Sequence, residues 1–269
     1  MKSKRIDSEI GIMLKMNKEG MVMNNVDKLI KILERLNSGE ESEHVKKEAG
    51  RILKSISPKE LSLAEQKLTE SGLSSDDMRA LCDVHIKILS SKLTKSKDLK
   101  KGHVIHTMTA EHEKILEFLG QLEKSNKNIQ KMWRYEKGNG EFKNLSQISK
   151  YLNEAESHHR REEDVLFPEL EKRGVTCPPQ VMRYEHEELR KNKKELIKLA
   201  KNAESMNFNE FKKSLNSTSR FIVSSLRDHI FKENNILYPT ALDVIKENKV
   251  WNKMKTECDK IGYCSFTKL

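Results

Sequence analysis

Apolar residues recur at helical spacing along most of the chain, and few turn signals interrupt them. Residues three and four apart lie on one face of an α-helix, so this spacing predicts amphipathic helices. The pattern is longest in the C-terminal two thirds, where short breaks at 138–140, 174–179 and 206–209 separate four segments. The four predicted helices are 107–131, 144–173, 179–202 and 209–247.

Short connections place consecutive helices antiparallel, so the four segments predict an up-and-down four-helix bundle over residues 101–250. Shorter helical patterns over 21–100 predict a smaller helical domain, in which Ser57 and Pro58 have the residue types of a helix start. Residues 1–20 are expected to form a polar leader. Residues 251–269 are expected to form a C-terminal tail that docks through Trp251 and Phe266.

Composition also favours an all-α protein. The 269 residues include 11 glycines and 5 prolines, about 6% together, whereas average usage is roughly 12%. All-β sandwiches and barrels need more turn residues, so they are disfavoured. The net charge of +10 is interleaved with acidic residues. Such a pattern is typical of solvated helix surfaces, so nucleic-acid binding is not expected.

Three further absences in the sequence bear on its location. No stretch reaches the roughly 18 apolar residues of a membrane span. The N-terminal residues lack the apolar run and cleavage site of a secretory signal. The 4 cysteines contain no C-x-x-C pair, which argues against a disulfide framework or a zinc ribbon. We therefore expect a cytoplasmic protein with reduced thiols and no membrane contact.

An internal repeat carries the candidate chemistry. Residues 158–168 read HHRREEDVLFP and residues 229–239 read HIFKENNILYP, so each unit is H-x-x-x-E followed by apolar residues and a proline. Residues four apart share a helix face, so each histidine and glutamate can present a nitrogen and a carboxylate to one point. The pairs are His158 with Glu162 and His229 with Glu233. The aromatic residues before the prolines are expected in the core, and the prolines are expected to kink or end their helices.

The other two bundle helices each offer one histidine in a similar setting, His112 and His186. Four imidazoles and two carboxylates are about enough for two metal ions that keep open positions. Nitrogen and oxygen donors without thiolates suit iron, manganese or zinc better than copper(I) or an iron–sulfur cluster. A ferritin-like site needs Glu-x-x-His motifs, and the matches at Glu41 and Glu156 do not place such motifs on two bundle helices.

The order H…HxxxE…H…HxxxE with its L-F-P and L-Y-P endings resembles the hemerythrin-like family, also called HHE cation-binding domains, over residues 104–248. The resemblance implies a bundle with a non-haem diiron site that binds dioxygen or nitric oxide. It implies as metal ligands His112, His158, Glu162, His186, His229 and Glu233. The region 24–106 resembles a helical domain of unassigned function that precedes such bundles in bacteria and archaea.

The third bundle helix departs from the pattern of the oxygen-carrying hemerythrins, which have an H-x-x-x-H pair there. Arg190 follows His186 by four residues and Met182 precedes it by four, so one imidazole is missing. This favours sensing, redox or repair chemistry over reversible oxygen carriage. His106 is an alternative for the missing ligand.

A second pair at i and i+4, His159 with Glu163, is rotated by about 100° from the first. Only one of the two pairs is expected to face the core squarely, and the match to the repeat favours His158 with Glu162. Glu163 stays an extra or alternative carboxylate.

These observations predict a protein that holds two iron ions, with zinc or manganese less expected. It would bind or sense dioxygen, nitric oxide or peroxide, in iron or redox stress, and act as a metal-binding sensor more than an enzyme. The N-terminal domain would read the metal state or bind a protein partner. Two alternatives remain: a diiron oxidoreductase or iron–sulfur repair protein, and a basic helical adaptor for nucleic acid or an acidic protein.

Overall fold

The computed structural model describes residues 99–267 without a gap, together with scattered positions between 27 and 67. Each described position between 27 and 67 lies in a helix, while the predicted polar leader lies outside the described residues. Residues 99–267 form helices joined by turns and contain no strand, which confirms the all-α prediction. Over the described part of the chain, no helix has the length and apolar character needed to cross a lipid bilayer.

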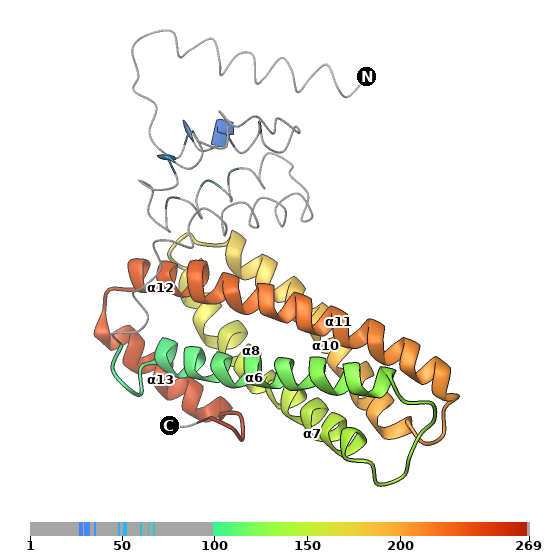
Figure 1. Ribbon diagram of the computed structural model, residues 1–269. Coiled ribbons are helices and arrows are strands. Elements are labelled where there is room, and N and C mark those ends of the chain that lie inside the picture. Colours follow the sequence, from blue (N-terminus) through green and yellow to red (C-terminus); the bar gives the residue numbers. More distant parts are fainter. Residues whose placement is uncertain are drawn as a thin grey trace, which may run out of the picture.

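Four long helices form the body of the bundle (Figure 1). Helix α6 packs against α7 and α11, and α10 packs against the same two helices, so the four make a closed ring. Consecutive helices are antiparallel, as the short connections predict. Their bounds are α6 (Val104–Gln130), α7 (Gly140–Glu154), α10 (Cys177–Asn202) and α11 (Phe208–Lys232).

Two of the connections end in an asparagine that caps the next helix. The Asn139 side chain accepts a hydrogen bond from the backbone N–H of Glu141 at 2.9 Å. The Asn207 side chain accepts from Asn209 at 3.0 Å and from Glu210 at 3.2 Å. Each cap satisfies backbone donors that have no partner inside the helix, which fixes where α7 and α11 begin.

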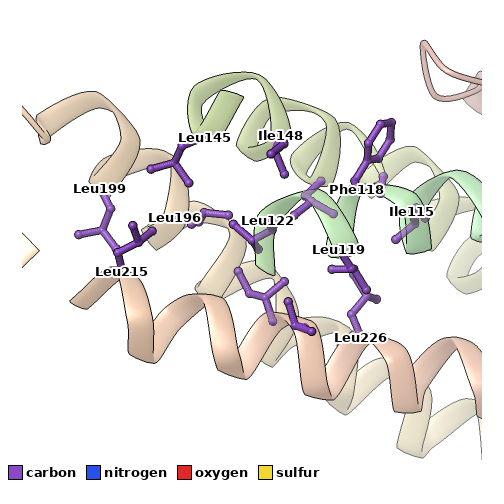
Figure 2. Packing of buried hydrophobic residues seen from close by; sticks show 14 of the residues in the cluster. Ile115, Phe118, Leu119, Leu122, Leu145, Ile148, Leu196, Leu199, Leu215 and Leu226 are labelled. Carbon is purple, nitrogen blue, oxygen red and sulfur yellow. The ribbon is translucent and has the colours of Figure 1, made fainter. Parts of the chain in front are cut away.

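Leucine-rich stripes of all four helices meet inside the bundle and form one apolar core (Figure 2). On α6, for example, Ile115, Leu119 and Leu122 recur every three or four residues and are almost fully buried. Burial of one such side chain stabilises the fold by about 1.5–3 kcal/mol. The stripes on the other helices include Leu145, Ile148, Leu196, Leu199, Leu215 and Leu226.

The second and fourth predicted helices are each divided by a π-helical turn. Helix α7 is followed by α8 (Glu156–Arg161), the π-turn η2 (Glu162–Leu166) and α9 (Phe167–Glu171). Helix α11 is followed by the π-turn η3 (Glu233–Leu237) and α12 (Tyr238–Val244). Each turn therefore begins at the glutamate of one repeat unit.

The prolines of the repeat account for these turns. A proline has no N–H, so the carbonyl four residues earlier loses its helical donor. The hydrogen bonds shift to five-residue spacing, with the Phe167 N–H bonded to the Glu162 carbonyl and the Tyr238 N–H to the Glu233 carbonyl. The prolines were expected to kink or end their helices; the irregularity is a π-turn that precedes each proline, and helix continues past it.

The C-terminal residues form a further helix, α13 (Asn248–Ile261), which packs against α6 and α8. Trp251 and Cys258 of this helix are buried, and the Trp251 indole donates to the Ile245 carbonyl at 2.9 Å. Phe266, beyond the helix, packs edge-on against Phe118 with ring centroids 5.1 Å apart. The last described residues thus lie against the bundle.

Candidate metal centre

Six ionisable side chains meet inside the bundle, next to the leucine-rich core. The histidines come from four helices, and the two glutamates are the first residues of the π-turns. All six are at most 1% exposed. Burial of this many ionisable groups is costly unless each has a partner, so the contacts of each side chain decide what the cluster can hold. The six are His112, His158, Glu162, His186, His229 and Glu233.

The histidines form two pairs. The Nε2 atoms of His112 and His158 are 3.0 Å apart, and those of His186 and His229 are 2.9 Å apart. Glu233 reaches both pairs, with Oε2 at 3.1 Å from His112 Nε2 and Oε1 at 2.7 Å from His229 Nε2.

Glu162 lies between the same two pairs. Its Oε2 is 3.5 Å from the Nε2 atoms of His158 and His186. The structure therefore brings together all six residues that the resemblance implies, as two imidazole pairs with two carboxylates between them.

The outer nitrogen of each imidazole is held by a side-chain oxygen. His158 Nδ1 lies 2.7 Å from Glu111, His229 Nδ1 lies 2.8 Å from Glu185, and His186 Nδ1 lies 2.6 Å from Glu163. A carboxylate only accepts, so the hydrogen is on Nδ1, and in a neutral ring the lone pair of Nε2 points inward. The fourth, His112 Nδ1, lies 2.8 Å from Asn234 Oδ1.

This arrangement fits a cation. Two Nε2 atoms about 3 Å apart need a positive charge between them, either a proton on one ring or a metal ion that both rings bind. One buried carboxylate oxygen at the centre, Glu162 Oε2, also has no hydrogen-bond partner among the described residues. Carboxylates that orient histidines from behind are the usual outer layer of metal sites, where they fix the ring and raise its basicity.

The carboxylates behind His158 and His229 and their cationic partners also occur at equivalent places in the two halves of the repeat. Arg161 donates to both oxygens of Glu111, at 2.6 and 2.7 Å, and Lys232 pairs with Glu185. Each of these cations directly precedes a glutamate of the centre. The sequence analysis missed this layer, although the signal is present: E-H-E occurs at both 111–113 and 185–187, and a basic residue precedes Glu162 and Glu233.

The two central carboxylates have opposite pKa shifts. Burial, reinforced by the charge of Glu233, raises the pKa of Glu162 well above its usual range. Burial also acts to raise the pKa of Glu233, but the neighbouring imidazoles, above all His229, outweigh it and hold that pKa well below its usual range. The two carboxylates thus differ in proton affinity before any cation binds.

The imidazoles differ in the same way. Burial lowers the pKa of His158 to about 4 despite its hydrogen bond to Glu111. Burial acts in the same direction on His229, but Glu233 and Glu185 outweigh it and raise that pKa to about 9. In the metal-free protein His229 is therefore a cation, and it pairs with the anionic Glu233.

The three residues that the sequence offers as additional or alternative metal ligands lie in different places. His159 is buried, and its nitrogen groups with those of His186 and His229. Glu163 lies behind His186 and pairs with Arg190 at 2.7 Å, so it orients that imidazole from outside. His106 lies near the start of α6 and belongs to none of the donor groups found among the described residues.

Only the pair of His158 and Glu162 therefore faces the centre with both side chains, although His159 also lies against it while Glu163 does not. The centre is wide enough to span two imidazole pairs, so a 100° sector of α8 faces it. His158 points toward His112, and the ring of His159 stacks on that of His186.

The aromatic residues of the repeat were expected in the core, and both Phe167 and Tyr238 are buried there, but Tyr238 also reaches the centre. Its hydroxyl donates to Glu162 Oε1 at 2.8 Å, and its ring is parallel to that of His112, with centroids 5.5 Å apart. Burial, with the charges of Glu162 and Glu233, raises the pKa of Tyr238 well above its usual range. Phe167, its counterpart in the repeat, stacks beside His186 with centroids 5.9 Å apart.

Comparison with known protein families finds two matches. The model described as the hemerythrin HHE cation binding domain matches residues 103–241, a range that contains every donor named above. A family of unknown function, DUF438, matches residues 29–95. A search among curated proteins found no match.

Proposed function

Because the chain belongs to the hemerythrin family of HHE cation-binding domains, we propose that its bundle holds two non-haem iron ions and binds or senses dioxygen, nitric oxide or a peroxide. The observation that carries this proposal is the pairing of the imidazoles. Two pairs of inward Nε2 atoms, each pair about 3 Å apart, face the same two carboxylates.

The donors divide between two ions. We assign His112 and His158 to one ion and His186 and His229 to the other, with Glu162 and Glu233 each near an imidazole of both pairs. His159 supplies the third imidazole of the second ion, in place of the histidine that Arg190 replaces on α10.

Iron fits this donor set, which contains imidazole nitrogens and carboxylate oxygens and no thiolate. Two irons supply exchangeable electrons and open positions for a small ligand when they are bound. The chain excludes bulk water by burying the donors and holds each imidazole in one orientation through its Nδ1 partner. These properties suit a site that responds to a small gas or peroxide.

We assign the protein-partner role to the N-terminal region, which matches DUF438. All donors assigned to the two ions come from residues 112–233, so the centre uses the bundle alone. This leaves the region 29–95 to pass the state of the centre to a partner.

Metal analysis tests the proposal. The purified chain should contain about two irons, and its visible spectrum should change on exposure to dioxygen or nitric oxide. The Glu162→Ala/Glu233→Ala variant should lose the iron. The matched control is Glu113→Ala/Glu187→Ala, because these exposed glutamates occupy equivalent places in the two E-H-E motifs. Iron content that is unchanged in the first variant would contradict the assignment.

A further inference from the structure

The two halves of the centre differ at one position of the repeat. Phe167 and Tyr238 both follow a π-turn directly, and both rings lie beside an imidazole of the centre. Only Tyr238 brings an oxygen atom to the donors. The half that contains His112 and His158 therefore has a polar group where the other half has a phenyl ring.

The Tyr238 hydroxyl lies among the donor atoms at short distances. It is 2.8 Å from Glu162 Oε1 and 3.4 Å from the Nε2 atoms of both His112 and His158. In an octahedral complex with bonds of about 2.1 Å, adjacent donors are about 3.0 Å apart. The hydroxyl is thus separated from three donors by nearly the distance that separates the ligands of one ion.

The π-turn explains how Tyr238 reaches this position. In an α-helix, residues five apart point in directions about 140° apart, at 100° per residue. The backbone N–H of Tyr238 instead bonds to the carbonyl of Glu233, which brings the two residues to the same side. The side chain is fully buried and its ring is parallel to that of His112, so the hydroxyl has little freedom to move away.

We propose that Tyr238 is a further metal ligand, whose oxygen binds, as a phenolate, the ion held by His112 and His158. This inference rests on the proposed two-iron centre. Binding exchanges the O–H bond for an oxygen–metal bond and releases the proton to the solvent, as metal binding does with other protonated ligands.

Each ion then has three terminal donors from this chain, but the donors differ in charge. One ion has two imidazoles and an anionic phenolate, and the other has the imidazoles of His159, His186 and His229. An anionic oxygen stabilises ferric more than ferrous iron. The two ions therefore differ in how readily they are reduced, although most of their ligands are related by the repeat.

Spectroscopy of the iron-loaded full chain tests this assignment. The metal-free protein is loaded with ferrous ion and oxidised in air, and its iron content, visible absorption and resonance Raman spectra are measured. A ferric phenolate gives an intense visible charge-transfer band and enhanced tyrosine ring modes. The Tyr238→Phe variant should lose both signals and, loaded with excess ferrous ion, keep about two irons, with one ion bound more weakly by at least the roughly 10–100-fold that loss of an outer partner costs. Phe167 shows that a phenyl ring fits the equivalent place.

The control is Tyr151→Phe, a tyrosine that packs against Phe118 in the apolar core and should keep both signals. A wild-type chain that holds two irons without phenolate modes would overturn the tyrosine assignment alone, and this spectrum decides the question even if the variant does not fold. Retention of the band in Tyr238→Phe would overturn it equally. A wild-type chain that binds no iron would overturn the proposed function, and this inference with it.

Discussion

The rings of His159 and His186 stack face to face, with centroids 3.9 Å apart and planes 8° apart. His186 is one of the paired imidazoles, so the stacking holds His159 at the edge of the centre, where burial lowers its pKa well below the usual range. A neutral imidazole in this place can offer a lone pair to a cation.

We therefore expect the His159→Phe variant to bind one of its two irons much more weakly. The substitution keeps a stacked ring and removes both nitrogens, so the loss should exceed the roughly 10–100-fold that removal of an outer hydrogen bond costs. Metal titration against a competing chelator measures it. His106→Phe is the matched control, and equal affinities in the two variants would remove His159 from the ligand set.

The outer carboxylates should act on separate ions. Glu111 holds His158, and Glu185 holds His229. Glu111→Gln and Glu185→Gln should each weaken the binding of one ion by roughly 10–100-fold and leave the other nearly unchanged. The same chelator titration, resolved into two binding steps, checks this. Weakening of both steps by either substitution would show that the two halves are not independent.

Thr267 should contribute to the centre from the end of the chain. Its hydroxyl donates to Glu111 Oε1 at 2.5 Å, beside Arg161, which holds the same carboxylate. Thr267→Val keeps the shape and removes the donor, so we expect a loss of about 1–2 kcal/mol in stability, near the lower range for a bond to a charged group. Thermal unfolding measures the loss, Thr267→Ser should restore most of it, and a failure of serine to do so would refute the role of the hydroxyl.

Lys193 should make stability depend on pH. This lysine on α10 is 1% exposed, and burial lowers its pKa to about 8, although it pairs with Glu156 at 3.7 Å. In an unfolded chain the pKa of a lysine is 10.5. Between these two values the unfolded chain holds a proton that the folded chain has lost, so this group adds stability as pH rises from 8 to 10.5.

The Lys193→Met variant should therefore be more stable than the parent at pH 7, by about 3 kcal/mol. The difference should narrow as the pH rises through the same window. Glu156 keeps its partner Arg190 in the variant. Denaturant unfolding of the metal-free protein at several pH values is the measurement, with Lys194→Met, an exposed neighbour, as control. A difference that is independent of pH would exclude titration as its cause.

The sequence predicted those parts of the fold that follow from periodicity and short connections. The apolar stripes of α6 and α11 recur every three or four residues, so their helices and inward faces follow directly. His112 and His186 could be placed in the centre because each precedes such a stripe on its helix. At these positions the helix is regular, so residues three or four apart in the sequence lie on the same face.

Other features of the centre depend on departures from the ideal helix or on distant chain segments. Tyr238 was expected in the core and is buried there, but ideal helical geometry would direct it away from Glu233, so its contact with the centre depends on the π-turn. Glu111 is next to His112 in the sequence but serves His158, on another helix. Thr267 meets Glu111 across 156 residues, a contact that no local pattern predicts.

The division of the donors between two halves of the chain also has a consequence during synthesis. The first hairpin contains His112, His158 and Glu162, and 71 residues separate His158 from His229. At about 5–20 residues per second, a ribosome needs roughly 4–14 seconds to add that length. During this interval the nascent chain displays half of the donors without Glu233, so the pair of ions can be held only after the second hairpin has closed on the first.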